Sequence, residues 1–169
     1  MSKCGMGAEP SELVYFPAAG GDRKDYVKRI YIRFTRHLAG NGLRLTDQRR
    51  RILDYFLQAD RHLSQEDIYG ALRRHGIGRA TVFRTLKMLE ECGIVNHVVG
   101  PKGTPRFEVE VDRPHHDHLI CVECGRIQEV RWPELEVIQE RACKKLGFVP
   151  KWHRHEIFGR CRECSVDKV

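Results

Sequence analysis

Two Cys-x-x-Cys pairs constrain this chain more than any other feature of its sequence. Cys121 and Cys124 form the first pair, Cys161 and Cys164 form the second, and 36 residues separate the pairs. Four thiolates complete the tetrahedral shell that Zn²⁺ prefers and leave no position open for a substrate, so such a site is normally structural. We therefore predict a structural zinc ion that ties two distant stretches of a small C-terminal module together.

The cysteine count argues against a disulfide framework. The chain has seven cysteines, an odd number, and its first 21 residues lack the basic start and apolar core of a signal peptide. No apolar run approaches the roughly 20 residues that a membrane-spanning helix needs. The sequence therefore predicts a reduced, cytoplasmic protein that does not engage a membrane.

Positive charge is concentrated in one half of the chain. Residues 22–106 carry 18 Lys and Arg against 9 Asp and Glu, whereas residues 107–169 carry 11 against 12. A basic half joined to a nearly neutral half rich in metal ligands favours a reader of polyanions attached to a sensor or assembly module. A merely solvated basic surface would give the same counts.

The basic half has a helical pattern followed by a β-rich one. Apolar residues recur at helical spacing in four segments between residues 25 and 91, and Thr46 and Ser64 are suited to cap the second and third. Two runs typical of strands, residues 94–99 and 106–111, then predict a hairpin. This order describes a winged helix-turn-helix, although a plain helical bundle has the same periodicity.

The second half predicts a small unit with the order β-β-α-β. Strand patterns surround Cys121, a helix runs from Pro133 to Gly147, and a last strand region covers residues 148–159. The apolar face of the helix, which we expect to point inward, consists of Leu135, Ile138, Ala142 and Leu146.

The segment HHDH, residues 115–118, carries four metal-ligand side chains in a row. Side chains alternate between the two faces of a strand, so His116 and His118 would share one face, and His115 and Asp117 the other. This parity favours two sites over one, although a solvated polar strand is the alternative. Imidazole and carboxylate ligands suit Fe²⁺, Mn²⁺, Zn²⁺, Co²⁺ or Ni²⁺. Candidates for the further ligands are His62, Glu108, Glu129, Glu136 and His153.

Several phrases of the sequence resemble the ferric uptake regulator family. They are RHLSQEDIY (61–69), GRATVFRTLKMLEECGIV (78–95), RFEV (106–109), HHDHLICVECGRIQEV (115–130) and GRCREC (159–164). The resemblance covers roughly residues 25–165 in order, and its HHDHLIC-x-x-CG phrase is highly specific.

The resemblance implies a cytoplasmic transcription regulator of the α/β (α+β) class and not an enzyme. An irregular extension (1–24) would precede a winged-helix DNA-binding domain with a hinge (25–111) and a metal-binding dimerisation domain (112–169). The expected partners are a double-stranded DNA operator and a second copy of the chain, in a homodimer or a tetramer.

Metal sites are carried over residue by residue. The structural zinc would use the four cysteines of the two pairs. The regulatory metal would use His62, Glu108, His116, His118 and Glu129, and a second site would use His115, Asp117, Glu136 and His153. Because His62 belongs to the DNA-binding half, metal in the regulatory site would tie the two domains together. One residue more than in the family's pattern lies between Glu108 and His115.

DNA contacts are expected on and near the fourth helix. Arg44 matches the family's basic residue that enters a narrow, A/T-rich minor groove. Phe83 stands where the family has tyrosine, so it offers an apolar face to thymine methyls but no hydroxyl. The full set expected to contact DNA is Arg44, Arg49, Arg79, Thr81, Phe83 and Arg84.

The identity of the regulatory metal rests on two carboxylates. A peroxide sensor of this family typically carries aspartate where this chain has Glu108 and Glu129. We therefore expect an Fe²⁺-dependent repressor of iron-uptake genes that binds an A/T-rich two-fold operator as a dimer, with Mn²⁺, Zn²⁺ or Co²⁺ as possible substitutes for iron. Peroxide, zinc or manganese sensing are the alternatives within the family. A metal-dependent hydrolase or oxygenase and a zinc-storage protein are the alternatives outside it.

Overall fold

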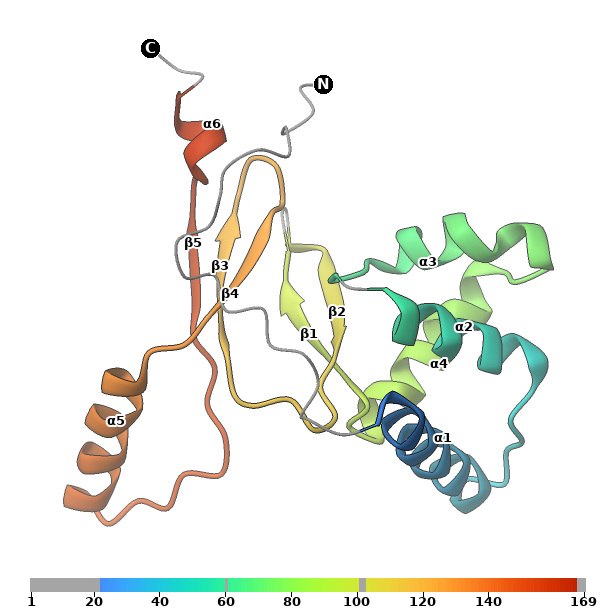
Figure 1. Cartoon of the computed structure of the whole chain (residues 1–169), viewed down its shortest axis with the longest axis horizontal. Coiled ribbons are helices and arrows are strands. Elements are labelled where there is room, and N and C mark those ends of the chain that lie inside the picture. The colour runs from blue at the N-terminus through green and yellow to red at the C-terminus, as the bar shows by residue number, and fades with distance from the viewer. Residues whose placement is uncertain (1–21, 60, 101–102, 167–169) are drawn as a thin grey trace. The chain divides into compact units, whose positions relative to one another are not determined.

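The computed structural model describes residues 22–59, 61–100 and 103–166, and Figure 1 shows their helices and strands. The described residues form two compact units. The first, here called the helical unit, comprises residues 22–99 and 103–114, and the second, the cysteine unit, comprises residues 115–166 with Gly100.

The first helix begins earlier than the sequence pattern predicts. Helix α1 spans Arg23–Gly40, because the Asp22 side chain accepts a hydrogen bond from the Lys24 backbone N–H and so caps the helix two residues before the predicted start. Residues 23 and 24 are therefore helical instead of irregular. Residues 1–21 of the predicted N-terminal extension lie outside the described residues.

The next three helices are confirmed at the predicted places. Helix α2 spans Asp47–Gln58 and is capped by the Thr46 side chain, and helix α3 spans Gln65–Leu72 behind a capping box of Ser64 and Asp67. A short 3₁₀ helix, η1 (Arg73–His75), leads to α4, which spans Arg79–Glu91. Helix α4 packs against α1, α2 and α3 and is the centre of the helical unit.

A two-stranded hairpin completes the helical unit. Strand β1 (Val95–Val99) pairs antiparallel with β2 (Pro105–Val109), and Leu63 before α3 forms a bridge with Phe107. Helices α1–α4 followed by this hairpin confirm the predicted winged helix-turn-helix. Strand β2 ends two residues before the predicted end, because the chain turns at Asp112, which has a φ of 57°.

The core of the helical unit is the apolar face that the helical spacing predicts. Ile30, Phe34 and Leu38 of α1 are fully or almost fully buried, together with Phe56 of α2 and Leu89 of α4. This continuous cluster fixes the orientation of α4 within the unit.

The cysteine unit has the predicted order β-β-α-β and one further helix. Its sheet has the order β4-β3-β5, in which β3 (Asp117–Cys121) is antiparallel to β4 (Ile127–Val130) and parallel to β5 (Glu156–Gly159). Helix α5 spans Pro133–Lys145, and a short helix that the sequence pattern did not predict, α6, spans Arg162–Val166.

The last strand is shorter than the region 148–159 that its sequence pattern predicts. Strand β5 pairs with β3 only from His118↔Glu156 to Cys121↔Gly159. Strand β3 begins at Asp117, and its His118 N–H donates to the His155 carbonyl at 3.1 Å, so its pairing with the last strand region starts only at the end of that region.

The apolar face of α5 does not point inward, which corrects the prediction from its spacing. No residue of α5 is buried in the described part of the chain, and the Ile138 side chain is 61% exposed. Leu146 follows the helix as its C-cap and is 80% exposed. Figure 1 shows α5 beyond one end of the three-stranded sheet and α6 beyond the other, so α5 does not cover the sheet.

No helix among the described residues is long and apolar enough to cross a membrane.

Candidate metal centres and basic surface

The four paired cysteines come together at one end of the sheet in the cysteine unit. Cys121 ends β3, Cys124 lies in the turn towards β4, Cys161 follows β5 and Cys164 lies in α6. Their sulfur atoms all lie within 4.8 Å of one another, and those of Cys124 and Cys161 are 3.7 Å apart. This set of sulfur donors has the composition and the proximity that a tetrahedral zinc site requires.

The surroundings of the four cysteine sulfurs are suited to thiolates that bind one cation together. Burial opposes ionisation of Cys121, but backbone N–H groups, including that of Cys161 at 3.3 Å from its sulfur, outweigh this effect and lower its pKa to about 6. In the absence of a cation, the side chain of Cys161 raises the pKa of Cys164. Four thiolates this close therefore need a positive ion between them, and Zn²⁺ fits.

A second cluster lies between the start of β3, helix α5 and the segment before β5. His115, Glu136 and His153 each offer a ligand atom within 4.8 Å of the others, and His153 Nε2 lies 3.0 Å from Glu136 Oε1. Asp117 joins them through a distance of 3.1 Å between its Oδ1 and His115 Nε2. The structure thus brings together the four residues that the resemblance assigns to the second site.

The opposite face of the same strand carries His116 and His118. The rings of His116 and His118 have centroids 5.0 Å apart, and Glu129 on β4 is the register partner of His118. His116 Nε2 lies 4.0 Å from Glu129 Oε1. Since His115 contacts Asp117 while His116 lies beside His118, the geometry within the cysteine unit follows the alternation expected of a strand.

The helical unit holds His62 beside Glu108. Reciprocal backbone hydrogen bonds of 2.8 Å between Leu63 and Phe107 align the segment before α3 with β2. This pairing places His62, which precedes Leu63, beside Glu108, which follows Phe107. His62 Nε2 lies 3.4 Å from Glu108 Oε2. Between Glu108 and His115, where the resemblance implies one additional residue, the chain turns at Asp112.

These nitrogen and oxygen donors suit a divalent metal such as Fe²⁺, Mn²⁺ or Zn²⁺. His62 and Glu108 belong to the helical unit, whereas His116, His118 and Glu129 belong to the cysteine unit.

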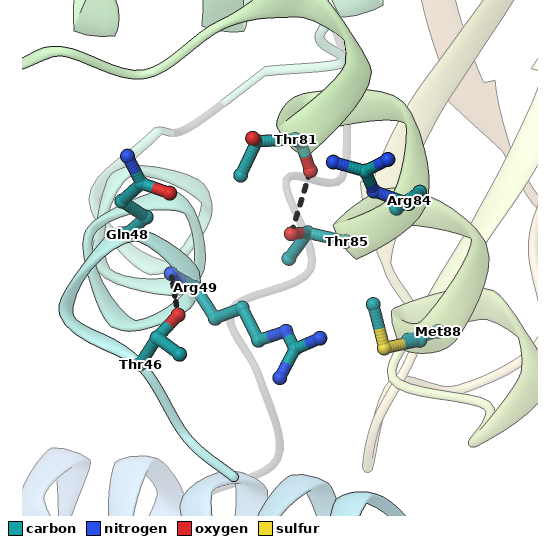
Figure 2. A pocket seen from close by; sticks show the side chains of 7 residues that line it. All are labelled: Thr46, Gln48, Arg49, Thr81, Arg84, Thr85 and Met88. Atoms are coloured by element: carbon teal, nitrogen blue, oxygen red, sulfur yellow. Dashed lines mark hydrogen bonds between the residues drawn. The ribbon is translucent and has the colours of Figure 1, made fainter. Parts of the chain in front are cut away.

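A pocket of about 160 Å³ lies between the start of α2 and helix α4 (Figure 2). Figure 2 shows Arg49 extending from α2 into the space in front of α4, where Arg84 lies on the facing side. The two guanidinium groups make this a place where a phosphate group can bind. The lining residues are Thr46, Gln48, Arg49, Thr81, Arg84, Thr85 and Met88.

The remaining residues expected to contact DNA differ in how available they are. Phe83 on α4 is 56% exposed, and Arg44 is exposed in the segment before α2. Arg79 is held within its own unit, because it donates two hydrogen bonds to Glu66, at 2.9 and 3.0 Å, and its guanidinium lies 4.0 Å from the centre of the Tyr69 ring. The positive charge of Arg79 is therefore partly neutralised by Glu66.

Two arginines beside the proposed ligands are not part of any motif in the sequence. Arg113 Nη1 donates a 2.7 Å hydrogen bond to Glu108 Oε2, and Arg131 Nε donates one of 2.8 Å to the His115 carbonyl. Periodicity and spacing give no signal for such contacts, because each depends on how a flexible side chain folds back on its own unit. Their closeness in sequence to ligand residues was the only indication available.

Comparison with known proteins gives a consistent result. The sequence matches the Ferric uptake regulator family over residues 40–158. It is 42% identical over 131 residues to a ferric uptake regulation protein of Bordetella parapertussis, a match that covers 76% of this chain and 94% of that protein. It is 35% identical over 130 residues to a peroxide operon regulator of Bacillus subtilis, with 76% of this chain and 88% of that protein covered.

Among solved structures, the ferric uptake regulator Fur of Helicobacter pylori is similar with a TM-score of 0.74 and 28% sequence identity. The similarity covers 86% of this chain and 95% of that one. The H. pylori protein has three functional metal-binding sites.

Proposed function

The chain belongs to the ferric uptake regulator family, and we propose that it is an Fe²⁺-dependent repressor of iron-uptake genes. It acts in the cytoplasm, as a homodimer or a tetramer, on an A/T-rich operator with two-fold symmetry. Its DNA-binding domain with the hinge covers residues 25–111, and its dimerisation domain covers residues 112–169, close to the division between the two compact units after Pro114.

Each candidate site has a separate proposed task. The cysteine cluster holds a structural Zn²⁺, and the second cluster stabilises the cysteine unit when a metal is bound. The regulatory site has ligands in both units. Its proposed ligands are His62, Glu108, His116, His118 and Glu129.

The observation that carries the proposal is the distribution of these five ligands. His62 and Glu108 lie beside each other in the helical unit, and His116, His118 and Glu129 lie together in the cysteine unit. Both groups can bind one ion only in a restricted set of relative orientations of the two units. A bound divalent cation supplies the positive charge that all these ligands share. Its loading then selects the orientation that fits a two-fold operator.

The carboxylates favour iron over peroxide as the signal. Both Glu108 and Glu129 are glutamates, whereas a peroxide sensor of this family typically carries aspartate at these positions. Peroxide sensing stays the second candidate because a peroxide operon regulator is among the relatives. Zinc and manganese sensing are the remaining alternatives.

The exposed apolar residues of the cysteine unit support self-association. Val137 and Ile138 on α5 are 43% and 61% exposed, and Phe148 and Trp152 after it are 67% and 82% exposed. An apolar surface of this kind is stable in water when a second copy covers it, as in the interface of an obligate dimer.

A regulator explains the ligand geometry better than a metal-dependent enzyme does. Catalytic metal ligands usually line one substrate pocket, whereas these ligands are divided between two units. The pocket in front of α4 instead presents Arg49 and Arg84, which suit a phosphate backbone.

The proposal is tested by titrating the full chain with Fe²⁺, Mn²⁺ and Zn²⁺ under nitrogen and measuring its binding to A/T-rich duplex DNA at constant salt. We expect Fe²⁺ to increase the affinity, and peroxide added in a brief low dose to leave the complex intact. Loss of binding after that dose, with oxidised His62 or His116 found by mass spectrometry, would instead establish a peroxide sensor. If the metal-loaded protein turned over a substrate and did not bind DNA, it would instead be a metal-dependent enzyme.

A further inference from the structure

Arg113 already pairs with one of the proposed ligands of the regulatory metal. Its Nη1 donates a 2.7 Å hydrogen bond to Glu108 Oε2, the same oxygen that lies 3.4 Å from His62 Nε2. The side chain of Arg113 is 12% exposed and that of Glu108 is 4% exposed. Both side chains of this pair are therefore largely shielded from solvent.

A buried carboxylate is costly unless a cation or hydrogen-bond donors compensate its charge. The guanidinium of Arg113 supplies both, and it stays charged at every pH that the protein meets. A hydrogen bond between two charged groups in such surroundings is stronger than one between neutral groups. Without metal, Glu108 is thus compensated by a cation that belongs to the chain itself.

The backbone around Arg113 holds it in this position. Its N–H donates to the Glu110 carbonyl at 3.2 Å, and Glu110 N–H donates to the Ile94 carbonyl at 2.9 Å. The preceding Asp112 accepts hydrogen bonds from Arg29 on α1, at 2.8 Å from Nη2 and 3.1 Å from Nε. Both flanks of the turn are anchored to the helical unit, so Arg113 is directed towards Glu108.

We propose that Arg113 is an internal counter-cation that competes with the regulatory metal for Glu108 and thereby sets the metal concentration at which the repressor loads. This inference rests on the proposed function, because it needs Glu108 to be a ligand. Arg113 must release Oε2, or share the charge of the carboxylate, before Glu108 can coordinate a metal fully. In either case the arginine weakens metal binding.

The opposite role for Arg113 would be to orient Glu108 for coordination, and it predicts the opposite sign. Removing an orienting residue loosens metal binding, whereas removing a competitor tightens it. The sign of the change in metal affinity therefore distinguishes the two roles.

The test measures Co²⁺ affinity by competition with a chelator, using full-length chain whose cysteine cluster is first loaded with Zn²⁺. All variants carry His153→Ala, which removes the second site. For Arg113→Gln we expect binding about tenfold tighter or more, because the apo state loses a charged hydrogen bond. For Arg113→Lys we expect a smaller tightening, because an ammonium is more strongly hydrated and pairs less well with a carboxylate.

Arg23→Gln is the matched control. It removes the same charge from the same unit, and Arg23 donates to the Leu57 carbonyl instead of to a ligand. We expect its Co²⁺ affinity to stay within about twofold of that of the parent. Equal or weaker binding by Arg113→Gln overturns the proposal. Should that variant fail to fold, unchanged or weaker binding by Arg113→Lys overturns it as well.

Failure of the proposed function has a separate signature. In the same assay, His62→Ala weakens Co²⁺ binding if the regulatory site exists as proposed. Unchanged binding by His62→Ala would remove the regulatory site and the role of Arg113 together. Weakened binding by His62→Ala with no tightening by Arg113→Gln would remove only the role of Arg113.

Discussion

A single carboxylate, that of Asp67, connects helix α3 to the hairpin. It accepts hydrogen bonds from the Ser64 backbone N–H at 2.8 Å and from the Ser64 hydroxyl at 2.7 Å, and it pairs with Arg106 of β2 at 2.7 Å. Burial opposes its ionisation, but these bonds and the charge of Arg106 outweigh burial and lower the pKa of Asp67. The same contacts hold β2 against the segment that carries His62.

This lowered pKa gives a stability prediction with a definite sign. A carboxyl whose pKa is lower in the folded state stabilises the protein above its ordinary pKa, and that stability is lost as the pH falls through the lowered value. We expect Asp67→Asn to reduce the free energy of unfolding by about 1 kcal/mol at neutral pH. The difference from the wild type should shrink in acid.

Urea unfolding followed by far-ultraviolet circular dichroism at several pH values checks this prediction, because helices α1–α4 of the helical unit contribute most of the helical signal. The control is Asp25→Asn, which changes an exposed carboxylate in the first turn of α1. It should change the stability by less than Asp67→Asn does. If the free energies of unfolding of Asp67→Asn and the wild type differed by the same amount down to strong acid, the lowered pKa of Asp67 would not stabilise the folded protein as predicted.

Arg79 and Arg84 lie on the same helix but should contribute differently to DNA binding. Arg84 lines the pocket in front of α4, whereas Arg79 is paired with Glu66 and stacked on Tyr69. We expect Arg84→Ala to weaken binding to A/T-rich duplex DNA by about 1–3 kcal/mol and Arg79→Ala by less than about 0.5 kcal/mol. Fluorescence anisotropy at fixed salt measures both. A larger loss for Arg79→Ala would show that Arg79 leaves its intramolecular partners to contact DNA.

At the scale of elements, the cysteine cluster connects strands that would otherwise share little core. It joins the end of β3 and its following turn to the end of β5 and helix α6. We expect Cys161→Ser to lose the bound Zn²⁺ and to unfold the cysteine unit, because metal binding in small modules is coupled to folding. Helices α1–α4 should remain folded, since their core consists of residues of the helical unit.

Zinc content by elemental analysis and limited proteolysis of the full chain check this result. Cys143→Ser on α5 is the matched control, because Cys143 lies outside the cluster. It should keep one structural zinc per chain. Full zinc content in Cys161→Ser would contradict the assignment of the four sulfurs to one site.

The sequence predicted the elements best where local signals agree. Thr46 and Ser64 marked the starts of α2 and α3 because a capping side chain acts within its own first turn. The alternation of the HHDH segment predicted which histidines lie together in the cysteine unit, because strand geometry alone fixes it.

Prediction failed where the outcome depends on distant parts of the chain. The pattern of residues 148–159 could not show that the strand register with β3 begins only at Glu156. The apolar spacing on α5 showed that Ile138 needs a covering surface, but not that the described chain provides none. The contact of Arg113 with Glu108 arises from the turn at Asp112, which has no strong sequence signature.

At the scale of the whole molecule, the exposed face of α5 should control association. We expect Ile138→Glu to convert the protein to monomers, because a charge in an apolar interface stays unpaired and desolvated. The control is Ile32→Glu, at a residue of α1 that is 49% exposed. It should not change the molar mass of the oligomer in solution. Light scattering after size-exclusion chromatography gives the masses. A dimer in the Ile138→Glu variant would place the interface elsewhere.

The central claim is that metal binding by ligands from both units controls DNA binding. Its most direct test is the affinity of the zinc-loaded protein for a two-fold A/T-rich duplex, measured at one salt concentration with and without Fe²⁺ under nitrogen. We predict at least about fivefold tighter binding with Fe²⁺ for the wild type, and no metal-dependent change for His62→Ala. Equal affinity of the wild-type protein in the two conditions would contradict the claim.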